Sequence, residues 1–399
     1  MSLALQAAAA LAAIPFVGGS LYLGLLALVA ILPARREEAN TRGGEPSRRF
    51  AFVIPARNEA PRIAALIESI GAVDYPQNLV RALVVADNCS DDTAAIARAA
   101  GADVVERADR RLVGKGHALA FGLAHLSAPY DAVVFVDGDC TVNAGCLSAI
   151  AGKLDGGADA VQAYYVMAPE RDARAAAVRS LALTLVHYVR PLAKERLHAS
   201  AGLKGSGMCF TRKLIEDLGW SATGLAEDVE QHVRLLHTGH RVAFAREAIV
   251  TGAAPDTLAD AGAQHRRWEA GRASAARRHG VRLLLEGLRT RSIARADAGV
   301  ELLLPPLSVV VAGVLAVAAL GAVMRWPWLV AASAVSVASL AGYVISGLWL
   351  QRLGARGTAQ ALLSMPRYAL WKLRLYGSAV ARPPAEWEPT RGGEDGPRG

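Results

Sequence analysis

Residues Ala132-Val-Val-Phe-Val-Asp-Gly-Asp-Cys140 give the most specific indication of the architecture of this chain. An apolar run, mostly β-branched or aromatic, leads directly into Asp137, Gly138 and Asp139, as in a buried strand that delivers two carboxylates at its end. Ligands of open α/β sheets bind beyond the carboxyl ends of the strands. Because Mg²⁺ and Mn²⁺ prefer oxygen ligands, Asp137 and Asp139 are candidate metal ligands. A plain Asp-rich turn is the alternative at this position.

Strands and helices alternate around this stretch. Four strands are expected, at 50–54, 79–85, 103–106 and 132–136, separated by helices at 61–70, 91–100 and 116–126. This alternation predicts an α/β domain with a mostly parallel, doubly wound sheet. Further along we expect a strand at 158–166, a long helix at 172–197, short strands at 208–210, 242–244 and 249–250, and helices within 225–237 and 257–272.

The composition points to a membrane rather than to nucleic acid. The formal net charge is +8 and 53% of the 399 residues are hydrophobic, a high share for a soluble enzyme. A basic chain is suited to nucleic acid or to an anionic membrane surface. No helix-turn-helix pattern or zinc-finger spacing supports nucleic acid. The four cysteines lack CxxC spacing, which indicates reduced thiols in a cytosolic compartment and no zinc site.

Long apolar segments predict about three transmembrane helices. Residues 7–32 and 327–350 carry no charge, and 300–324 carry one, with Pro305-Pro306 as a kink. A signal peptide is the alternative for the first segment, but it lacks a basic start. Arg35-Arg36 and Arg352 then place the intervening domain in the cytoplasm, on a multi-pass inner-membrane protein.

These features predict the following domains: an N-terminal transmembrane helix (1–33), a linker (34–48), the α/β domain (49–272), a basic amphipathic interfacial segment (273–298), a transmembrane hairpin (299–350), an interfacial helix (351–382) and a disordered tail (383–399).

Polar motifs also follow the other expected strands. Pro55-Ala-Arg-Asn-Glu59 follows the first strand. Asp87 ends the second, just before Ser90 and Asp91, which suit the cap of the next helix. Gly114-Lys115-Gly-His117 opens a helix, and a lysine at a helix N-terminus suits a diphosphate.

Two later motifs contain further candidate site residues. Glu227 and Asp228 open a helix, where acids serve either as ordinary partners of the helix dipole or as a general base. Gln264, Arg267 and Trp268 lie within about one turn of another helix. Arg267 suits a phosphate and Trp268 a sugar ring, whereas an amphipathic helix with a buried tryptophan is the alternative.

In this order, the motifs resemble those of the inverting family-2 glycosyltransferases with the GT-A fold. The resemblance covers about residues 50–270 and is strongest to the membrane-bound branch with a Q-x-x-R-W motif, which includes the cellulose, chitin and hyaluronan synthases and ceramide glucosyltransferase. Ala86 in place of a first Asp and Ala226 in place of a Thr depart from the usual pattern, so no single synthase is indicated.

The resemblance implies roles for these residues. Asp228 would deprotonate the acceptor, and Asp137 and Asp139 would hold Mg²⁺ or Mn²⁺ and the diphosphate. The residues implied to bind substrate or nucleotide are Pro55, Glu59, Asp87 (near the base or ribose), Lys115, Asp137, Glu227, Gln264, Arg267 and Trp268.

The expected function is inverting transfer of a hexosyl or N-acetylhexosaminyl group from a nucleotide-sugar. The resemblance favours a UDP-sugar. Three spans and basic interfacial helices suit a lipid or lipid-linked acceptor at the cytoplasmic face of the bilayer, and a polysaccharide acceptor stays open because Q-x-x-R-W is frequent in synthases. One alternative is a processive exopolysaccharide synthase subunit, which would need homo-oligomerisation or export partners because three helices are few for a polymer channel. Two remote alternatives are a sugar nucleotidyltransferase, although Pro55 to Glu59 is not that class's glycine-rich loop, and an inert nucleotide-binding membrane scaffold.

Overall fold

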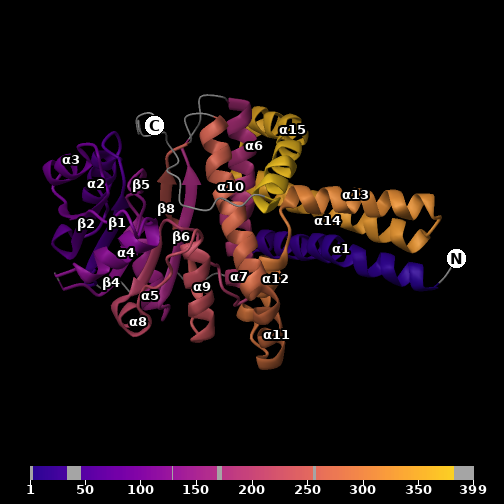
Figure 1. Cartoon of the computed structure of the whole chain (residues 1–399), viewed down its shortest axis with the longest axis horizontal. Coiled ribbons are helices and arrows are strands. Elements are labelled where there is room, and N and C mark those ends of the chain that lie inside the picture. Colours follow the sequence, from indigo (N-terminus) through magenta and orange to yellow (C-terminus); the bar gives the residue numbers. More distant parts are fainter. Residues whose placement is uncertain (1–2, 34–45, 128, 169–172, 255–257, 382–399) are drawn as a thin grey trace. The chain divides into compact units, whose positions relative to one another are not determined.

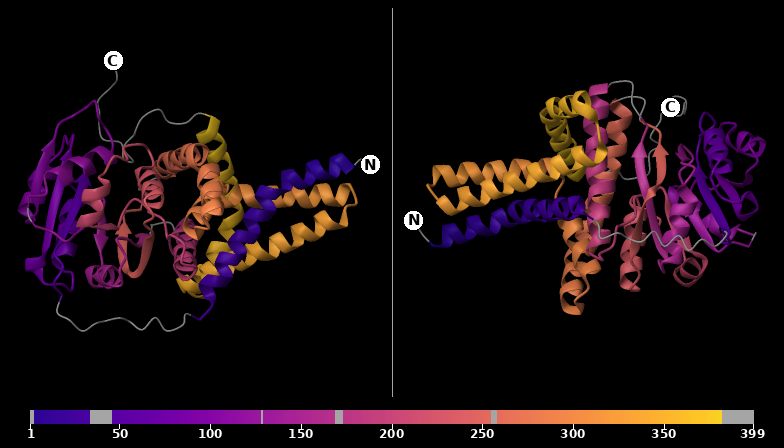
Figure 2. Two further views of the ribbon diagram at one scale, coloured as in Figure 1. Left: turned by 90° about the horizontal axis from the view of Figure 1, so that it is seen from below. Right: turned by 180° about the vertical axis from the view of Figure 1, so that it is seen from behind.

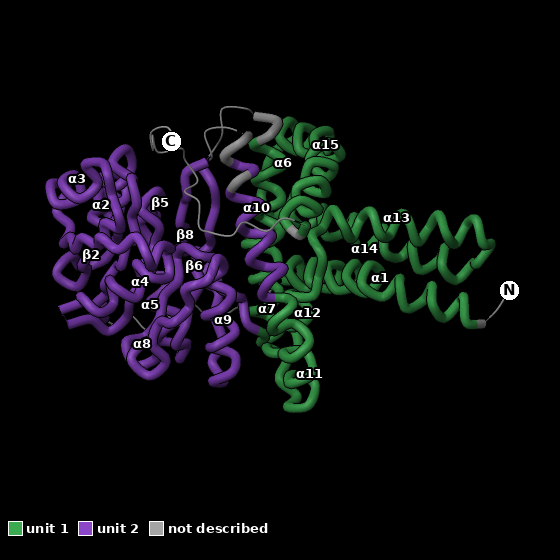
Figure 3. Tube along the Cα trace, in the orientation of Figure 1, with its two compact units in different colours: residues 1–34, 171–199, 276–381 green, residues 35–170, 200–275, 382–399 purple. Residues whose placement is uncertain are grey.

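The computed structural model describes residues 3–33, 46–127, 129–168, 173–254 and 258–381. The expected linker lies largely, and the expected tail entirely, outside these residues. The chain forms two compact units (Figure 3). Unit 1 combines residues 1–34, 171–199 and 276–381, and unit 2 combines 35–170, 200–275 and 382–399.

Unit 2 is built on one eight-stranded sheet with the order β3-β2-β1-β4-β7-β6-β8-β5 (Figure 1). Its strands β1 to β4 are mutually parallel, β6 and β8 are parallel to each other, and β7 and β5 pair antiparallel with their neighbours. The expectation of a mostly parallel sheet is therefore confirmed. The strands are β1 Phe50–Ala56, β2 Val80–Asp87, β3 Asp103–Arg107, β4 Ala132–Phe135, β5 Cys140–Val142, β6 Ala160–Met167, β7 Met208–Thr211 and β8 Val242–Gly252.

Helices cover both faces of this sheet. Phe52 and alternate residues of β1 pack with α2 and α5 in one core. On the opposite face α4 lies so close to β1 and β2 that a Cβ at Gly122 would meet Val53 at 2.6 Å and Val85 at 2.8 Å. The helices are α2 Ile63–Gly71, α3 Thr93–Ala99, α4 Lys115–Ala124, α5 Cys146–Asp155, α8 Arg212–Leu218, α9 Glu227–His237 and α10 Leu258–Ala275, with a 3₁₀ turn η1 at Gln77–Leu79.

Three details differ from the sequence expectation. The strands expected at 242–244 and 249–250 are one strand, β8, whose pairing with β6 shifts register between Ala163 and Tyr164. The short elements β5, α5 and α8 were not expected. The long helix expected at 172–197 is divided into α6 (Ala173–Thr184), a π-helical turn η2 (Leu185–Val189) and α7 (Arg190–Arg196). Pro191 has no N–H to donate to residue 187, which accounts for the interrupted hydrogen-bond ladder.

Unit 1 contains the long apolar helices. Helices α1 (Leu3–Ile31), α13 (Leu307–Val323) and α14 (Pro327–Gln351) run alongside one another (Figures 1 and 2). By length and composition α1 and α14 are able to cross a membrane, and a third crossing is possible if α12 (Ile293–Leu303) and α13, bent by 74°, form one span. The bend lies at Pro305-Pro306, as the sequence predicts. The other elements of unit 1 are η3 Ala276–Gly280, α11 Val281–Thr290 and α15 Gly354–Ala381.

A buried charge network ties four helices of unit 1 together. Lys194 of α7 is fully buried, with its Nζ 2.9 Å from Asp297 Oδ2 and in an ion pair with Glu301, both on α12. The hydroxyl of Tyr22, on α1, donates a hydrogen bond of 2.8 Å to Asp297. Arg190 lies 3.5 Å from Glu301 and donates to the Tyr343 hydroxyl of α14. Buried ions require such pairing, so the network constrains how these helices pack.

Candidate active site

Lys115 is the centre of the acidic cluster in unit 2. It begins α4, and its Nζ lies 2.5 Å from Asp137 Oδ1 and 3.5 Å from Glu227 Oε1. The ammonium also donates a hydrogen bond of 2.8 Å to the Gly205 carbonyl. Burial alone lowers the pKa of Lys115, but the carboxylates of Asp137 and Glu227 outweigh it and hold the pKa above its usual value. The lysine therefore stays charged among the acids.

Glu227 and Asp228 enter this cluster from the first turn of α9. A methyl group at Gly205 would lie 3.6 Å from Lys115 Nζ and 3.9 Å from Asp228 Oδ2, so both side chains face the same glycine. Burial, opposed by Lys115, raises the pKa of Glu227 to about 7, and the Asp228 charge adds to that rise. Burial likewise raises the pKa of Asp228, against Lys115. The pair thus shares negative charge near neutral pH.

The Asp137-Gly138-Asp139 turn lies against the loop after β1. The Gly138 N–H donates to the Pro55 carbonyl at 3.3 Å, and a Cβ at Gly138 would lie 3.4 Å from Cγ of Glu59. The two turns follow adjacent parallel strands, β1 and β4, and therefore meet at the same edge of the sheet. The structure accordingly brings Pro55, Glu59 and Asp137 together, as the sequence predicts.

The loop Ala201–Gly207 was not singled out from the sequence, yet it contacts both sides of the cluster. Its Gly205 carbonyl accepts from Lys115, and the Ser206 hydroxyl accepts a hydrogen bond of 3.1 Å from the Asp137 N–H. Gly205 has φ +81°, which favours glycine. The glycines of Gly202-Leu-Lys-Gly-Ser-Gly207 were the available signal, because three of them within six residues indicate backbone that must approach other groups closely.

Asp87 has a partner that the sequence did not reveal. Its Oδ1 lies 2.6 Å from Arg107 Nη1, and both side chains are only 7% exposed. Asn88 donates a further hydrogen bond of 2.9 Å to the same oxygen. Burial raises the pKa of Asp87, and Arg107 opposes that rise. Arg107 faces Asp87 because β2 and β3 are parallel with these two residues in register.

Three of the expected site residues, Gln264, Arg267 and Trp268, lie on α10. α10 packs against the chain just before α9, where a Cβ at Gly271 would lie 2.9 Å from Cβ of Ala226. Trp268 stacks edge-on against His265 at 5.1 Å between ring centroids. Gln264 Oε1 is buried without a hydrogen-bond partner among the described residues. Arg267 and Trp268 therefore lie one turn before the point where α10 meets the acid-bearing segment.

The chain supplies two carboxylates, Asp137 and Asp139, for a divalent cation. Among the residues that the structure describes, no group of three or more His, Cys, Asp or Glu side chains is arranged to hold a metal. Mg²⁺ and Mn²⁺ commonly use one or two carboxylates and complete their coordination with phosphate and water oxygens. The side chain of Asp137 is 33% exposed and thus accessible. The donor set fits a cation that binds together with a diphosphate.

Comparison with known proteins agrees with this arrangement. The family described as "Glycosyltransferase like family 2" matches residues 46–271, more than half of the chain and all of the segments just described. The chain belongs to glycosyltransferase family 2. Over 95 residues it is 40% identical to a 4,4'-diaponeurosporenoate glycosyltransferase of Staphylococcus aureus (strain MRSA252), a match that spans 23% of this chain and 24% of that relative.

A solved structure has the same fold as this family-2 chain. It is a mannosyltransferase from Pyrobaculum calidifontis in complex with GDP-Man and Mn²⁺, with a TM-score of 0.56 and 20% sequence identity. The similarity covers 86% of this chain and 99% of that one. The sheet of unit 2 thus has the GT-A fold that the motifs implied.

Proposed function

We propose that this chain is a metal-dependent, inverting glycosyltransferase of the inner membrane. It transfers a hexosyl or N-acetylhexosaminyl group from a UDP-sugar to a lipid or lipid-linked acceptor at the cytoplasmic face. The main support for the proposal is the convergence of three acids on the ammonium group of Lys115. These acids, Asp137, Glu227 and Asp228, come from two further segments of the chain. Membership of family 2 supplies the reaction class and the nucleotide-sugar donor.

Asp228 acts as the general base. It takes the proton from the acceptor hydroxyl while the acceptor oxygen forms its bond to the anomeric carbon and the bond from that carbon to the diphosphate breaks. One displacement without an enzyme nucleophile inverts the configuration. Burial raises the pKa of Asp228 toward neutral pH. A general base is most effective when its pKa lies near the working pH.

Lys115 stabilises the departing nucleoside diphosphate. Its pKa is held high by the neighbouring carboxylates, so it is a permanent cation at the N-terminus of α4, where backbone N–H groups also favour anions. Asp137 and Asp139 are the residues that would hold the divalent cation, which supplies further neutralisation of the charge on the leaving group. Arg267 and Trp268 are proposed to contact the diphosphate and the acceptor.

The acceptor is proposed to be a lipid because the same chain carries two helices, or three with the bent pair, that are able to cross a membrane. The Staphylococcus relative, named for 4,4'-diaponeurosporenoate, supports a small apolar acceptor over a polymer. A processive exopolysaccharide synthase subunit stays the second candidate and requires partners or oligomerisation. UDP is proposed from the family resemblance, although the Pyrobaculum structure holds GDP-Man.

The test is incubation of native membranes containing the full chain with a panel of labelled UDP- and GDP-sugars, followed by product mass. A single sugar on an extractable lipid is the expected product, and a ladder of polymer would favour the synthase candidate. The Asp228→Asn variant should still bind the donor but transfer it at least about 10²-fold more slowly. Asp217→Asn is the matched control, because Asp217 forms an exposed pair with Lys213. Equal turnover in Asp228→Asn and Asp217→Asn would remove Asp228 from the mechanism.

A further inference from the structure

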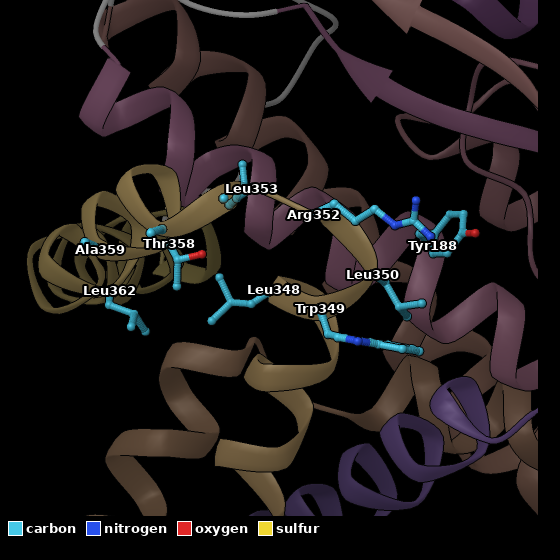
Figure 4. A pocket seen from close by; sticks show the side chains of 11 residues that line it. Tyr188, Leu348, Trp349, Leu350, Arg352, Leu353, Thr358, Ala359 and Leu362 are labelled. Carbon is cyan, nitrogen blue, oxygen red and sulfur yellow. The ribbon is translucent and has the colours of Figure 1, made fainter.

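A pocket of about 900 Å³ opens in unit 1 where α14 ends and α15 begins. Its lining comes from the last turn of α14, the link that follows it, the first turns of α15, and Tyr188 of η2 (Figure 4). Leu348 and Trp349 line it from α14 and Leu362 from α15. A volume of this order is in the range of pockets that bind small organic ligands.

The walls of this pocket are more apolar than polar, with Tyr188 and Thr358 among the leucines, and its lining includes a cation. Arg352 lines the pocket in the link between the two helices, with φ 54°, directly after the apolar run of α14. The Arg352 side chain forms no ion pair with any carboxylate that the structure describes, so its charge is not neutralised there. Trp349, one turn earlier, is 62% exposed, as is typical of tryptophans at the boundary between lipid and water.

The surrounding helix extends this positive character. α15 carries Arg356, Arg367, Lys372 and Arg374 and no acidic residue. Basic residues at the end of a span attract anionic lipid headgroups. An apolar cavity that ends in a cation next to a span is complementary to a molecule with a hydrocarbon chain and a negative head.

We propose that this pocket binds one anionic glycerophospholipid. Arg352 pairs with the phosphate of the headgroup, and an acyl chain lies against Leu348, Trp349 and Leu362. A neutral or zwitterionic lipid has no net charge to offer Arg352 and binds less well. The proposal requires α14 to lie in a bilayer. It requires neither a sugar donor nor an acceptor, so its test is independent of the proposed enzymatic activity.

The test titrates the purified full chain in detergent with phosphatidylglycerol or phosphatidylcholine of identical acyl chains, and counts bound lipid by native mass spectrometry. One phosphatidylglycerol should bind with higher affinity than phosphatidylcholine. Arg352→Gln should weaken phosphatidylglycerol binding by about fivefold, the usual scale for one basic residue at an anionic surface. Arg356→Gln is the matched control, because Arg356 is exposed on the next turn but does not line the pocket.

A second pair of variants separates loss of the pocket from loss of charge. Ala359→Trp fills the pocket from α15 and should abolish the tight site, whereas Leu363→Trp, at a residue that is 83% exposed and outside the lining, should not. Equal affinity for the two lipids, or tight binding retained in Ala359→Trp, overturns the proposal. Displacement of phosphatidylglycerol by inorganic phosphate at a similar concentration overturns it as well, because the site would then recognise phosphate alone.

Discussion

Replacing Lys115 by Met should destabilise unit 2 more than the loss of any surface lysine. The Nζ group lies 2.5 Å from Asp137 Oδ1, 2.8 Å from the Gly205 carbonyl and 3.5 Å from Glu227 Oε1. Breaking a buried ion pair from one side costs about 3–5 kcal/mol, because the remaining charge is left unpaired. Asp137 is partly open to water, so the lower figure, about 3 kcal/mol, is appropriate. For a domain of this size that corresponds to a fall in Tm of about 6–12 °C.

The stability lost in Lys115→Met should also depend on pH and should be larger above neutral pH than below it. Folding raises the pKa of Glu227 to about 7, so the stability contributed by this group is lost as the pH rises through 7. Lys115 lowers that pKa. Removing the lysine therefore raises the pKa further, and the variant loses more stability above neutral pH than below it.

The assay is thermal unfolding of the purified full chain in detergent, without metal or donor, at about pH 6 and about pH 8.5. Lys213→Met is the control, since Lys213 forms an exposed pair with Asp217 and should leave Tm unchanged. Adding Glu227→Gln to Lys115→Met should restore part of the loss, because one unpaired carboxylate is removed. A Lys115→Met variant as stable as Lys213→Met, or a double variant no better than the single one, would refute the description of Lys115 as the counter-charge of these acids.

Two further predictions concern catalysis. Because burial raises the pKa of Glu227 to about 7 and also raises that of Asp228, protonation of the pair should slow transfer as the pH falls below about 7; a flat kcat profile between about pH 6 and pH 9 would contradict this. Chelation of divalent cations should stop transfer, and added Mn²⁺ or Mg²⁺ should restore it, because without a cation between them the carboxylates of Asp137 and Asp139 repel the diphosphate; full activity in excess EDTA would rule out the metal.

The regular part of the sheet domain was predictable because its central strands, β1 and β4, are buried at every position. Residues 50–56 are apolar at every position and are covered on both faces, so the sequence carries a continuous signal. Asp137 and Asp228 are expected site residues for a different reason, because one lies just after the end of β4 and the other in the first turn of α9. Their roles in metal binding and catalysis stay predictions. Short elements such as β5 carry too few residues for any periodicity to show.

The partners of the expected site residues were not predictable, because they depend on register and on distant loops. Arg107 reaches Asp87 only through the alignment of β2 with β3, which no local pattern specifies. Gly205 and Ser206 meet Lys115 and Asp137 across separations of 90 and 69 positions. The sequence predicts two strands in place of the single strand β8, because Arg246 and Glu247 interrupt its apolar pattern at an exposed bulge.

The two units are interleaved along the chain, and this has a consequence for biosynthesis. β4 cannot acquire its neighbour β7 until the ribosome has passed residue 211, and helices α6 and α7, which belong to the apolar unit, are made in between. During synthesis the edge of β4 therefore stays unpaired while helices of the other unit are made. For the same reason, trimming the chain from its termini cannot isolate unit 2, since residues 171–199 would still carry a fragment of the other unit.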